Sequence, residues 1–142
     1  MRPPNGKSIF AGGVIAVVAA VVVGGLLFLD SPGQERRRRL DGRRVADLTR
    51  MADAVDLYWT RQATLPTSLE KLARTPGLHV DWRDPVTVQP YEYQALGDST
   101  YELCAVFERT SAASGREEKF GFWSHGVGRQ CFRLTAKKIE GR

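Results

Sequence analysis

Residues 40–61 read LDGRRVADLTRMADAVDLYWTR, a stretch with a regular pattern of apolar residues. Apolar residues recur along it at spacings of three and four: Val45, Leu48, Ala52, Val55 and Trp59. The spacing predicts an amphipathic helix, with Asp47, Arg50 and Asp53 mostly on the opposite, polar side. Because Tyr58 and Trp59 broaden the apolar face, we expect the helix to pack against a flat surface such as a β-sheet.

A short second helix is predicted directly after the first. Thr67-Ser68-Leu69-Glu70 has the pattern of a capping box, in which a hydroxyl and a carboxylate satisfy the first backbone N–H groups. Leu69 and Leu72 would then face the core. Pro76-Gly77 would end the helix.

The remainder of the domain reads as antiparallel strands. Tyr91–Gln94 and Tyr101–Phe107 flank a turn at Gly97-Asp98-Ser99, which predicts a hairpin. Both faces of Tyr101–Phe107 carry apolar residues, so this strand should be central. The last strands are expected at Phe120–Trp123 and Cys131–Leu134, after a polar loop over residues 110–118. The prediction is an α+β domain over residues 40–135, with a helix packed on a small antiparallel sheet.

Before this domain, the run from Ile9 to Leu29 has 21 residues without a charge: IFAGGVIAVVAAVVVGGLLFL. At about 1.5 Å per residue such a helix spans roughly 30 Å, the thickness of the bilayer hydrocarbon. A cleaved signal peptide is the alternative, but its apolar region is usually shorter, at about 7–15 residues. We therefore expect a transmembrane helix over residues 9–29, after a short basic N-terminus over residues 1–8. Residues 30–39, with Ser31-Pro32-Gly33 and four arginines, would form a juxtamembrane linker.

Two features disagree about which side of the membrane the domain faces. Six arginines follow the apolar run, against Arg2 and Lys7 before it: Arg36, Arg37, Arg38, Arg39, Arg43 and Arg44. The positive-inside rule then favours the cytoplasmic side, and the same arginines would contact anionic lipid headgroups. Cys104 and Cys131 would instead favour the periplasmic side if they form a disulfide, worth roughly 3–4 kcal/mol. The alternative for this pair is two buried thiols.

Composition limits the partners. The chain has 21 basic and 16 acidic residues, for a formal net charge of +5, and two of the bases precede the apolar run. The domain is therefore only mildly basic, which argues against a nucleic-acid partner. We expect the lipid bilayer and an unidentified membrane protein as partners.

Catalytic signals are weak. The chain has two histidines, His79 and His125, and a metal site needs several ligands at set spacings. Ser124-His125 with Cys131 is the one arrangement that suggests a nucleophile and base or a partial metal site. Asp84-Pro85 is typical of a turn, since Asp accepts local backbone hydrogen bonds. We expect no catalytic, cofactor-binding or metal-binding residues.

The order of these parts resembles the soluble domain of type II secretion major pseudopilins, a type IV pilin-like fold. The residues that carry the resemblance are a helix ending in Asp56-Leu57-Tyr58-Trp59, then Leu65-Pro66-Thr67, then Asp84-Pro85 with Pro90-Tyr91-Glu92-Tyr93. The likeness covers about Leu40–Phe107, and it implies a helix packed on a strand meander.

The chain departs from the prepilin pattern in several places. A pilin precursor has a basic leader ending in glycine and a glutamate five residues into the mature helix, whereas the apolar run here has no glutamate and Lys7 follows Gly6. Ser31-Pro32-Gly33 interrupts the helix, and Val88 replaces the usual turn glycine. The final Ile139–Arg142 matches a protease recognition sequence added to recombinant proteins, so the tail over residues 136–142 is given no function.

The sequence thus favours a single-pass protein of the bacterial inner membrane, with a pilin-like domain and a non-enzymatic accessory or interaction role. The domain is expected on the cytoplasmic side, with the periplasmic side as the alternative. The alternative functions are a pseudopilin-like component of a secretion or pilus-type filament, and a ligand-binding or catalytic site around His125–Cys131.

Overall fold

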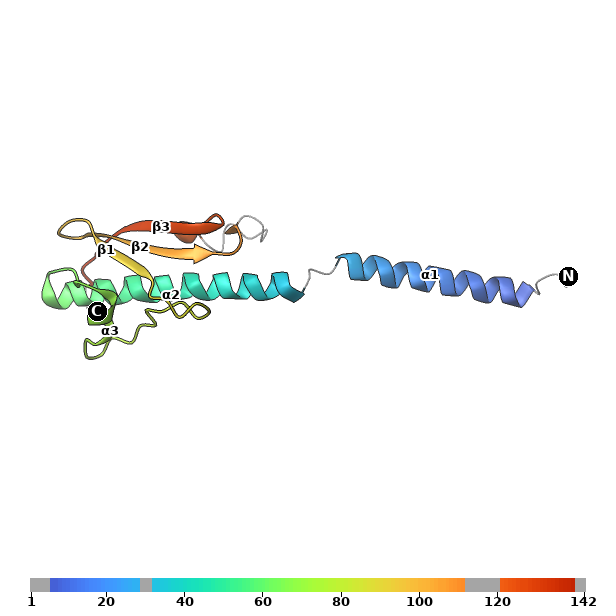
Figure 1. The fold of residues 1–142 in the computed structure, drawn as a ribbon, viewed down its shortest axis with the longest axis horizontal. Helices are drawn as coiled ribbons and strands as arrows, with labels where there is room; N and C mark the ends of the chain where they lie inside the picture. Colours follow the sequence, from blue (N-terminus) through green and yellow to red (C-terminus); the bar gives the residue numbers. More distant parts are fainter. Residues whose placement is uncertain (1–5, 29–31, 112–120, 140–142) are drawn as a thin grey trace. The chain divides into compact units, whose positions relative to one another are not determined.

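In a computed structural model, residues 6–28, 32–111 and 121–139 are described (Figure 1). The chain divides into two compact units, Met1–Glu35 and Arg36–Arg142. The second unit holds the α+β domain, whose class is as the sequence predicts.

The first unit contains helix α1, Gly6–Phe28, which is 23 residues long. Its apolar side chains are exposed, among them Phe10, Ile15 and Val21 at 69–75%. Within residues 6–28, 32–111 and 121–139, no helix is both long enough and apolar enough to cross a membrane.

Helix α2 runs from Pro32 to Gln62, so it begins eight residues before the expected start at Leu40. The prediction of a linker over residues 30–39 is therefore wrong from Pro32 onward. Proline is compatible with the first helical position, because the backbone N–H that it lacks would have no partner in the helix there.

A three-stranded antiparallel sheet packs along α2 (Figure 1). Its strands are β1, Glu92–Ala95, β2, Thr100–Phe107, and β3, Gly128–Thr135, in the order β1-β2-β3. The predicted hairpin and the central position of its second strand are confirmed.

The core lies between α2 and one face of the sheet. Leu48, Met51 and Val55 of α2 have no exposed surface, and Tyr58 is 7% exposed. Val45 and Trp59, the first and last residues of the predicted apolar stripe, are only half-buried. From β2, alternate residues enter the core: Tyr101, Leu103, Ala105 and Phe107.

Two segments differ from the sequence-based expectation. The strand expected at Phe120–Trp123 is wrong over its described residues, because Gly121–Trp123 forms a short 3₁₀ helix, η2, and Gly121 has a φ of +44° that is not a strand conformation. Phe120 lies outside the described residues. Helix α3, Leu69–Ala73, is capped by Ser68, whose hydroxyl accepts a hydrogen bond from the N–H of Lys71 at 3.1 Å. Its cap is thus one residue later than the predicted box, and Leu69 and Leu72 are buried as expected.

Residues after β3 also belong to the domain. The N–H of Lys137 donates to Asp56 and that of Ile139 to Thr60, both at 2.9 Å. Ala136 is buried. The described part of the expected tail is therefore bonded to α2, so the domain extends beyond Thr135.

Val88 occupies an unfavourable backbone conformation. Its φ is +59°, in the left-handed region, where a β-branched residue is strained. The turn holds it there, since Val88 N–H donates to the Asp84 carbonyl at 3.0 Å and Asp84 N–H donates to the Gln89 carbonyl at 2.8 Å.

We expect Val88→Asn to raise the free energy of unfolding by about 1 kcal/mol, because Asn tolerates positive φ and Val88 is 61% exposed. Urea unfolding of the full chain in detergent, followed by fluorescence, measures the change. The control is Val86→Asn in the same turn, which should be neutral. Equal effects at the two positions would contradict the strain.

Candidate functional site

Polar residues of α2 extend its buried stripe toward the N-terminus. Asp41 and Arg44 precede Leu48 at the spacing of three and four that continues to Met51. Both are as buried as the apolar residues, at 4% and 3% exposure. The stripe therefore ends in charges, and each of these needs a partner inside the protein.

Arg44 is the centre of a buried ion network. Its Nε lies 2.5 Å from Asp84 Oδ2, its Nη1 lies 2.8 Å from Asp41 Oδ1, and the same Nη1 lies 3.6 Å from Glu108. Burial alone would lower the pKa of the guanidinium, but hydrogen bonds to Asp84 and Asp41 raise it above its ordinary value. Arg44 therefore stays charged and joins α2 to two distant segments.

The carboxylates of Asp41 and Asp84 also accept backbone hydrogen bonds. Asp41 accepts from the N–H groups of Glu108 and Arg109, just after β2, at 3.1 and 2.8 Å. Asp84 accepts from Val86 and Thr87 at 2.8 and 2.9 Å, which confirms the predicted turn. Burial opposes ionisation of Asp84, yet the bonds from Arg44, Thr87 and Val86 hold its pKa below the usual value.

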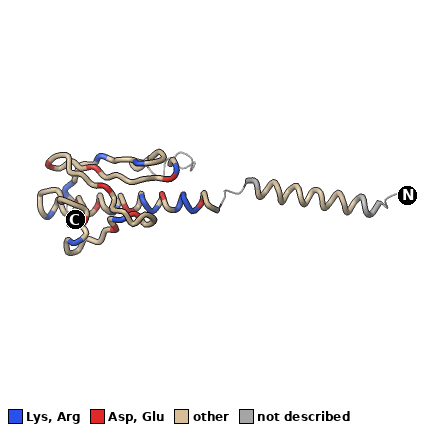
Figure 2. The backbone as a smooth tube through the Cα atoms, in the orientation of Figure 1, with Lys and Arg blue, Asp and Glu red and all other residues tan. Residues whose placement is uncertain are grey.

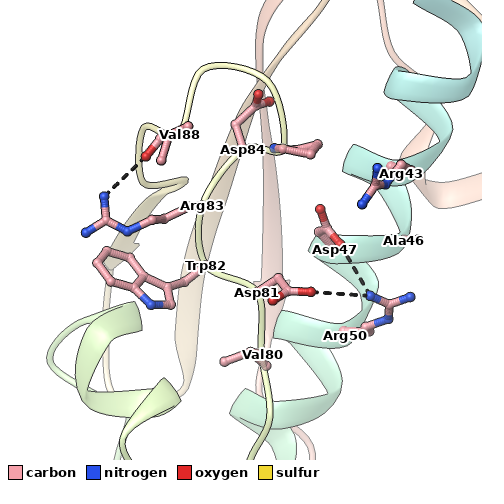
Figure 3. Close-up of a pocket in the computed structure, with 11 residues that line it drawn as sticks. Arg43, Ala46, Asp47, Arg50, Val80, Asp81, Trp82, Arg83, Asp84 and Val88 are labelled. Atoms are coloured by element: carbon pink, nitrogen blue, oxygen red, sulfur yellow. Dashed lines mark hydrogen bonds and ion pairs between the residues drawn. The ribbon is translucent and has the colours of Figure 1, made fainter. Parts of the chain in front are cut away.

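A groove of about 540 Å³ lies beside this network, between α2 and the segment 80–88 (Figure 3). Arg43, Asp47 and Arg50 line it from α2. The opposite wall includes Trp82 and Arg83. Val80, Asp81, Asp84, Pro85 and Val88 complete that wall, and Ala46 completes the first. The groove combines an indole ring, aliphatic groups and charges of both signs.

The charges that reach solvent in the groove are mainly basic. Arg43, Arg50 and Arg83 are exposed, whereas Asp81 is the exposed acid among the lining residues. Arg50 lies 3.4 Å from Asp47 and 3.9 Å from Asp81, separations too long for tight pairing. The Arg83 guanidinium lies 4.1 Å from the centre of the Trp82 ring. In Figure 3 the Arg83 side chain points away from α2, toward the Val88 carbonyl that accepts its hydrogen bond at 3.2 Å, so an anionic group between the walls would meet Arg43 and Arg50 of α2.

Asp47 faces inward from the groove. Its Oδ2 accepts a hydrogen bond of 3.0 Å from the Tyr91 hydroxyl. Burial raises the pKa of Asp47, while the Tyr91 hydrogen bond and the charge of Arg50 act in the opposite direction. The sequence-based placement of Asp47 on the polar face is therefore wrong, because Tyr91 provides an interior partner.

The two cysteines form a disulfide, Cys104–Cys131, between directly paired residues of β2 and β3. Glu102 lies close enough that its carboxylate and the two sulfurs are within 4.8 Å of one another. With the sulfurs bonded to each other, neither serves as a thiolate ligand for a metal ion.

The structure separates the residues of the suspected His125–Cys131 site. The His125 ring is buried and stacks on Phe107 of the core face, with ring centres 3.7 Å apart. Ser124 Oγ lies 3.0 Å from Ser111 Oγ. Cys131 lies in the disulfide on a strand whose core-facing residue is its neighbour Phe132. These positions give His125 a packing role and leave Cys131 without a thiol.

Of the six arginines after the apolar run, Arg44 is buried and the other five are exposed or half-buried. Arg44 was expected to contact lipid headgroups, and this is wrong, because Asp41 and Asp84 hold it in the interior. Arg37 is exposed and lies 3.5 Å from Glu108, and Arg38 is half-buried. Arg36, Arg39 and Arg43 follow one another at spacings of three and four and are exposed. Figure 2 shows these basic positions at the start of α2.

The Arg44–Asp84 pair was not predicted, although the sequence of α2 carries a signal for it. The stripe Leu48–Met51–Val55 continues backward, at the same spacing, to Arg44 and Asp41. A charged residue at a predicted core position implies a buried partner.

No known protein family, curated protein or solved structure matches the chain.

We expect Arg44→Met to lower the free energy of unfolding by about 3–5 kcal/mol, because two buried carboxylates lose their counter-ion. The matched control is Arg43→Met, an adjacent exposed arginine, which should change stability by less than about 0.5 kcal/mol. Denaturant unfolding of the full chain in detergent measures both.

The pH dependence of the stability lost in Arg44→Met distinguishes a loss of charge pairing from a loss of packing. The pKa of Asp84 is lower in the folded chain, so its contribution is present above the ordinary carboxyl pKa of about 4 and disappears as pH falls through the folded value. The difference between the wild-type chain and Arg44→Met should therefore shrink in acid. A difference that is constant with pH would rule out the ionic explanation.

Proposed function

We propose that this chain is a membrane-anchored, non-enzymatic interaction protein, whose α+β domain has a pilin-like form. The observation that carries the proposal is the uncharged run from Ile9 to Leu29, which is followed at once by a domain with its own core. A run of 21 uncharged residues is costly to expose to water, and a lipid bilayer is the environment that accommodates it.

The proposed anchor is the whole uncharged run, which begins at Ile9 and ends at Leu29. The structure describes the side chains of α1 from Phe10 to Leu26. All of the side chains described in α1 are apolar or glycine. The proposed span therefore rests on the composition of the whole run.

The disulfide favours an oxidising compartment for the domain. Cys104–Cys131 would be reduced by the thiol systems of the cytosol. The arginine count favours the opposite side, but Arg44 is part of the domain interior, which leaves five of the six arginines near the membrane. We give the disulfide more weight and place the domain on the periplasmic side, which reverses the cytoplasmic preference of the sequence.

The interaction role follows from the groove between α2 and residues 80–88. Its exposed charges are Arg43, Arg50 and Arg83 against Asp81, and Trp82 offers an aromatic surface. Such a surface complements a protein segment that carries acidic side chains next to apolar ones. We propose that the partner presents such an acidic segment.

A pseudopilin-like filament component is the second candidate. The 31-residue helix α2 with an antiparallel sheet along it supports this alternative. The absence of a glutamate from the sequence Ile9–Leu29 argues against assembly through a processed prepilin helix. Mass spectrometry of the chain from membranes distinguishes the two, since a filament component would lack its N-terminal leader and an anchored protein would retain Met1.

For the anchor and its orientation, we expect the chain to resist carbonate extraction from bacterial membranes. Deletion of residues 1–29 should release the domain, while deletion of residues 2–8 should not. A C-terminal alkaline phosphatase fusion should be active, and maleimide should label Cys104 and Cys131 only after reduction. Labelling of both thiols without reduction would place the domain in the cytoplasm.

For the interaction surface, we expect a photo-crosslinking amino acid at Asp81, which is 82% exposed at the groove, to trap a partner in cells. Arg43→Glu with Arg50→Glu should abolish that crosslink, because both changes repel an acidic segment. A crosslinker at exposed Gln94 on β1 serves as the matched control. A crosslink at Asp81 that survives both charge reversals would refute the acidic-partner proposal.

A further inference from the structure

The two faces of the sheet differ in what covers them. Leu103, Ala105 and Phe107 point into the core, whereas Glu102, Cys104 and Val106 belong to the other face. Val106 is 57% exposed, so this outer face is open to solvent there. The disulfide therefore lies on the solvent side of the sheet and outside the hydrophobic core.

This disulfide links two strands that backbone hydrogen bonds already hold together. Cys104 and Cys131 are the central members of an antiparallel ladder with eight residue pairs, from Thr100–Thr135 to Phe107–Gly128. The ladder holds β2 against β3, and the core packs against the opposite face. Reduction would thus break one cross-link in a sheet that keeps its backbone hydrogen bonds.

The two sulfurs are not equivalent. Cys104 is 4% exposed, while Cys131 is half-buried. Glu92 of β1 and Arg129 of β3 form an ion pair across β2, with an Nη2–Oε2 distance of 2.6 Å and an Nε–Oε1 distance of 3.0 Å. Glu92 is paired with Cys104 in the sheet, so this ion pair lies over the Cys104 side of the disulfide. An attacking thiolate therefore has better access to Cys131.

Arg129 also favours the departure of Cys104. Its Nη2 lies 3.5 Å from the Cys104 sulfur. A thiol leaves a disulfide faster when its thiolate is stabilised, and a nearby guanidinium stabilises a thiolate. Glu102 opposes this effect, but its closest approach to the Cys104 sulfur is longer, at 4.0 Å. Accessibility and charge thus assign opposite roles to the two cysteines.

We propose that Cys104–Cys131 is a thiol–disulfide exchange site for a partner dithiol, with Cys131 as the attacked sulfur and Cys104 as the leaving group. A partner thiolate attacks Cys131 Sγ, the Cys131–Cys104 bond breaks, and the electron pair leaves on Cys104 Sγ beside Arg129. The second partner thiol then attacks the partner sulfur of the mixed disulfide and releases Cys131. The chain gains two electrons, the partner dithiol becomes a disulfide, and its two protons pass to the released thiolates or to water.

The test uses the full chain in detergent micelles, with reduced glutathione as the probe. After the reaction is quenched with N-ethylmaleimide, peptide mass spectrometry should find glutathione on Cys131 and maleimide on Cys104. Circular dichroism should show that the sheet persists after complete reduction by dithiothreitol. Glutathione on Cys104, equal modification of both cysteines, or reaction only in denaturant would overturn the proposal.

A pair of variants tests the role of Arg129. Arg129→Gln should slow formation of the glutathione adduct by about threefold, because the leaving thiolate loses its nearest positive charge. Arg133→Gln is the matched control, since Arg133 is also exposed on β3 and lies two residues beyond Cys131, and it should leave the rate unchanged. Equal rates for the two variants would exclude Arg129 as the stabilising group.

Discussion

The buried guanidinium of Arg44 is the constraint on which the domain depends. A charge at 3% exposure is stable only if opposite charges and hydrogen bonds replace the water that it has lost. Asp41 and Asp84 provide them, and each is in turn fixed by backbone N–H groups of its own segment or a neighbouring one. The position of Arg44 therefore determines where the end of β2 and the turn at residues 84–88 lie against α2.

Other polar groups of α2 extend the same principle along the helix. Asp47 accepts from Tyr91 just before β1, Asp56 accepts from Lys137, and Thr60 accepts from Ile139. The apolar stripe of α2 buries surface against the sheet, but the hydrophobic effect is non-directional and does not fix how the two elements are aligned. These hydrogen bonds fix the register between helix and sheet. Helix α2 thus fixes the positions of the turns and of the chain after β3.

The groove and the disulfide occupy regions with different chemistry. The groove takes its arginines from α2 and from a turn that Arg44 holds in place, so its shape depends on the buried network. The disulfide lies on the outer face of the sheet, where Glu92 and Arg129 cover one sulfur more than the other. A partner at the groove and a dithiol at Cys131 would therefore meet separate surfaces of the domain.

The sequence predicts the α+β class, the amphipathic helix and the hairpin, because those follow from the local periodicity of apolar residues. It also named Cys104 and Cys131, but could not decide between a disulfide and two thiols, since that depends on strand register. Arg44 with Asp84, forty residues apart, and the groove beside them were decided only by the tertiary structure. Periodicity shows which residues are buried, whereas the partner of a buried charge depends on how distant segments meet.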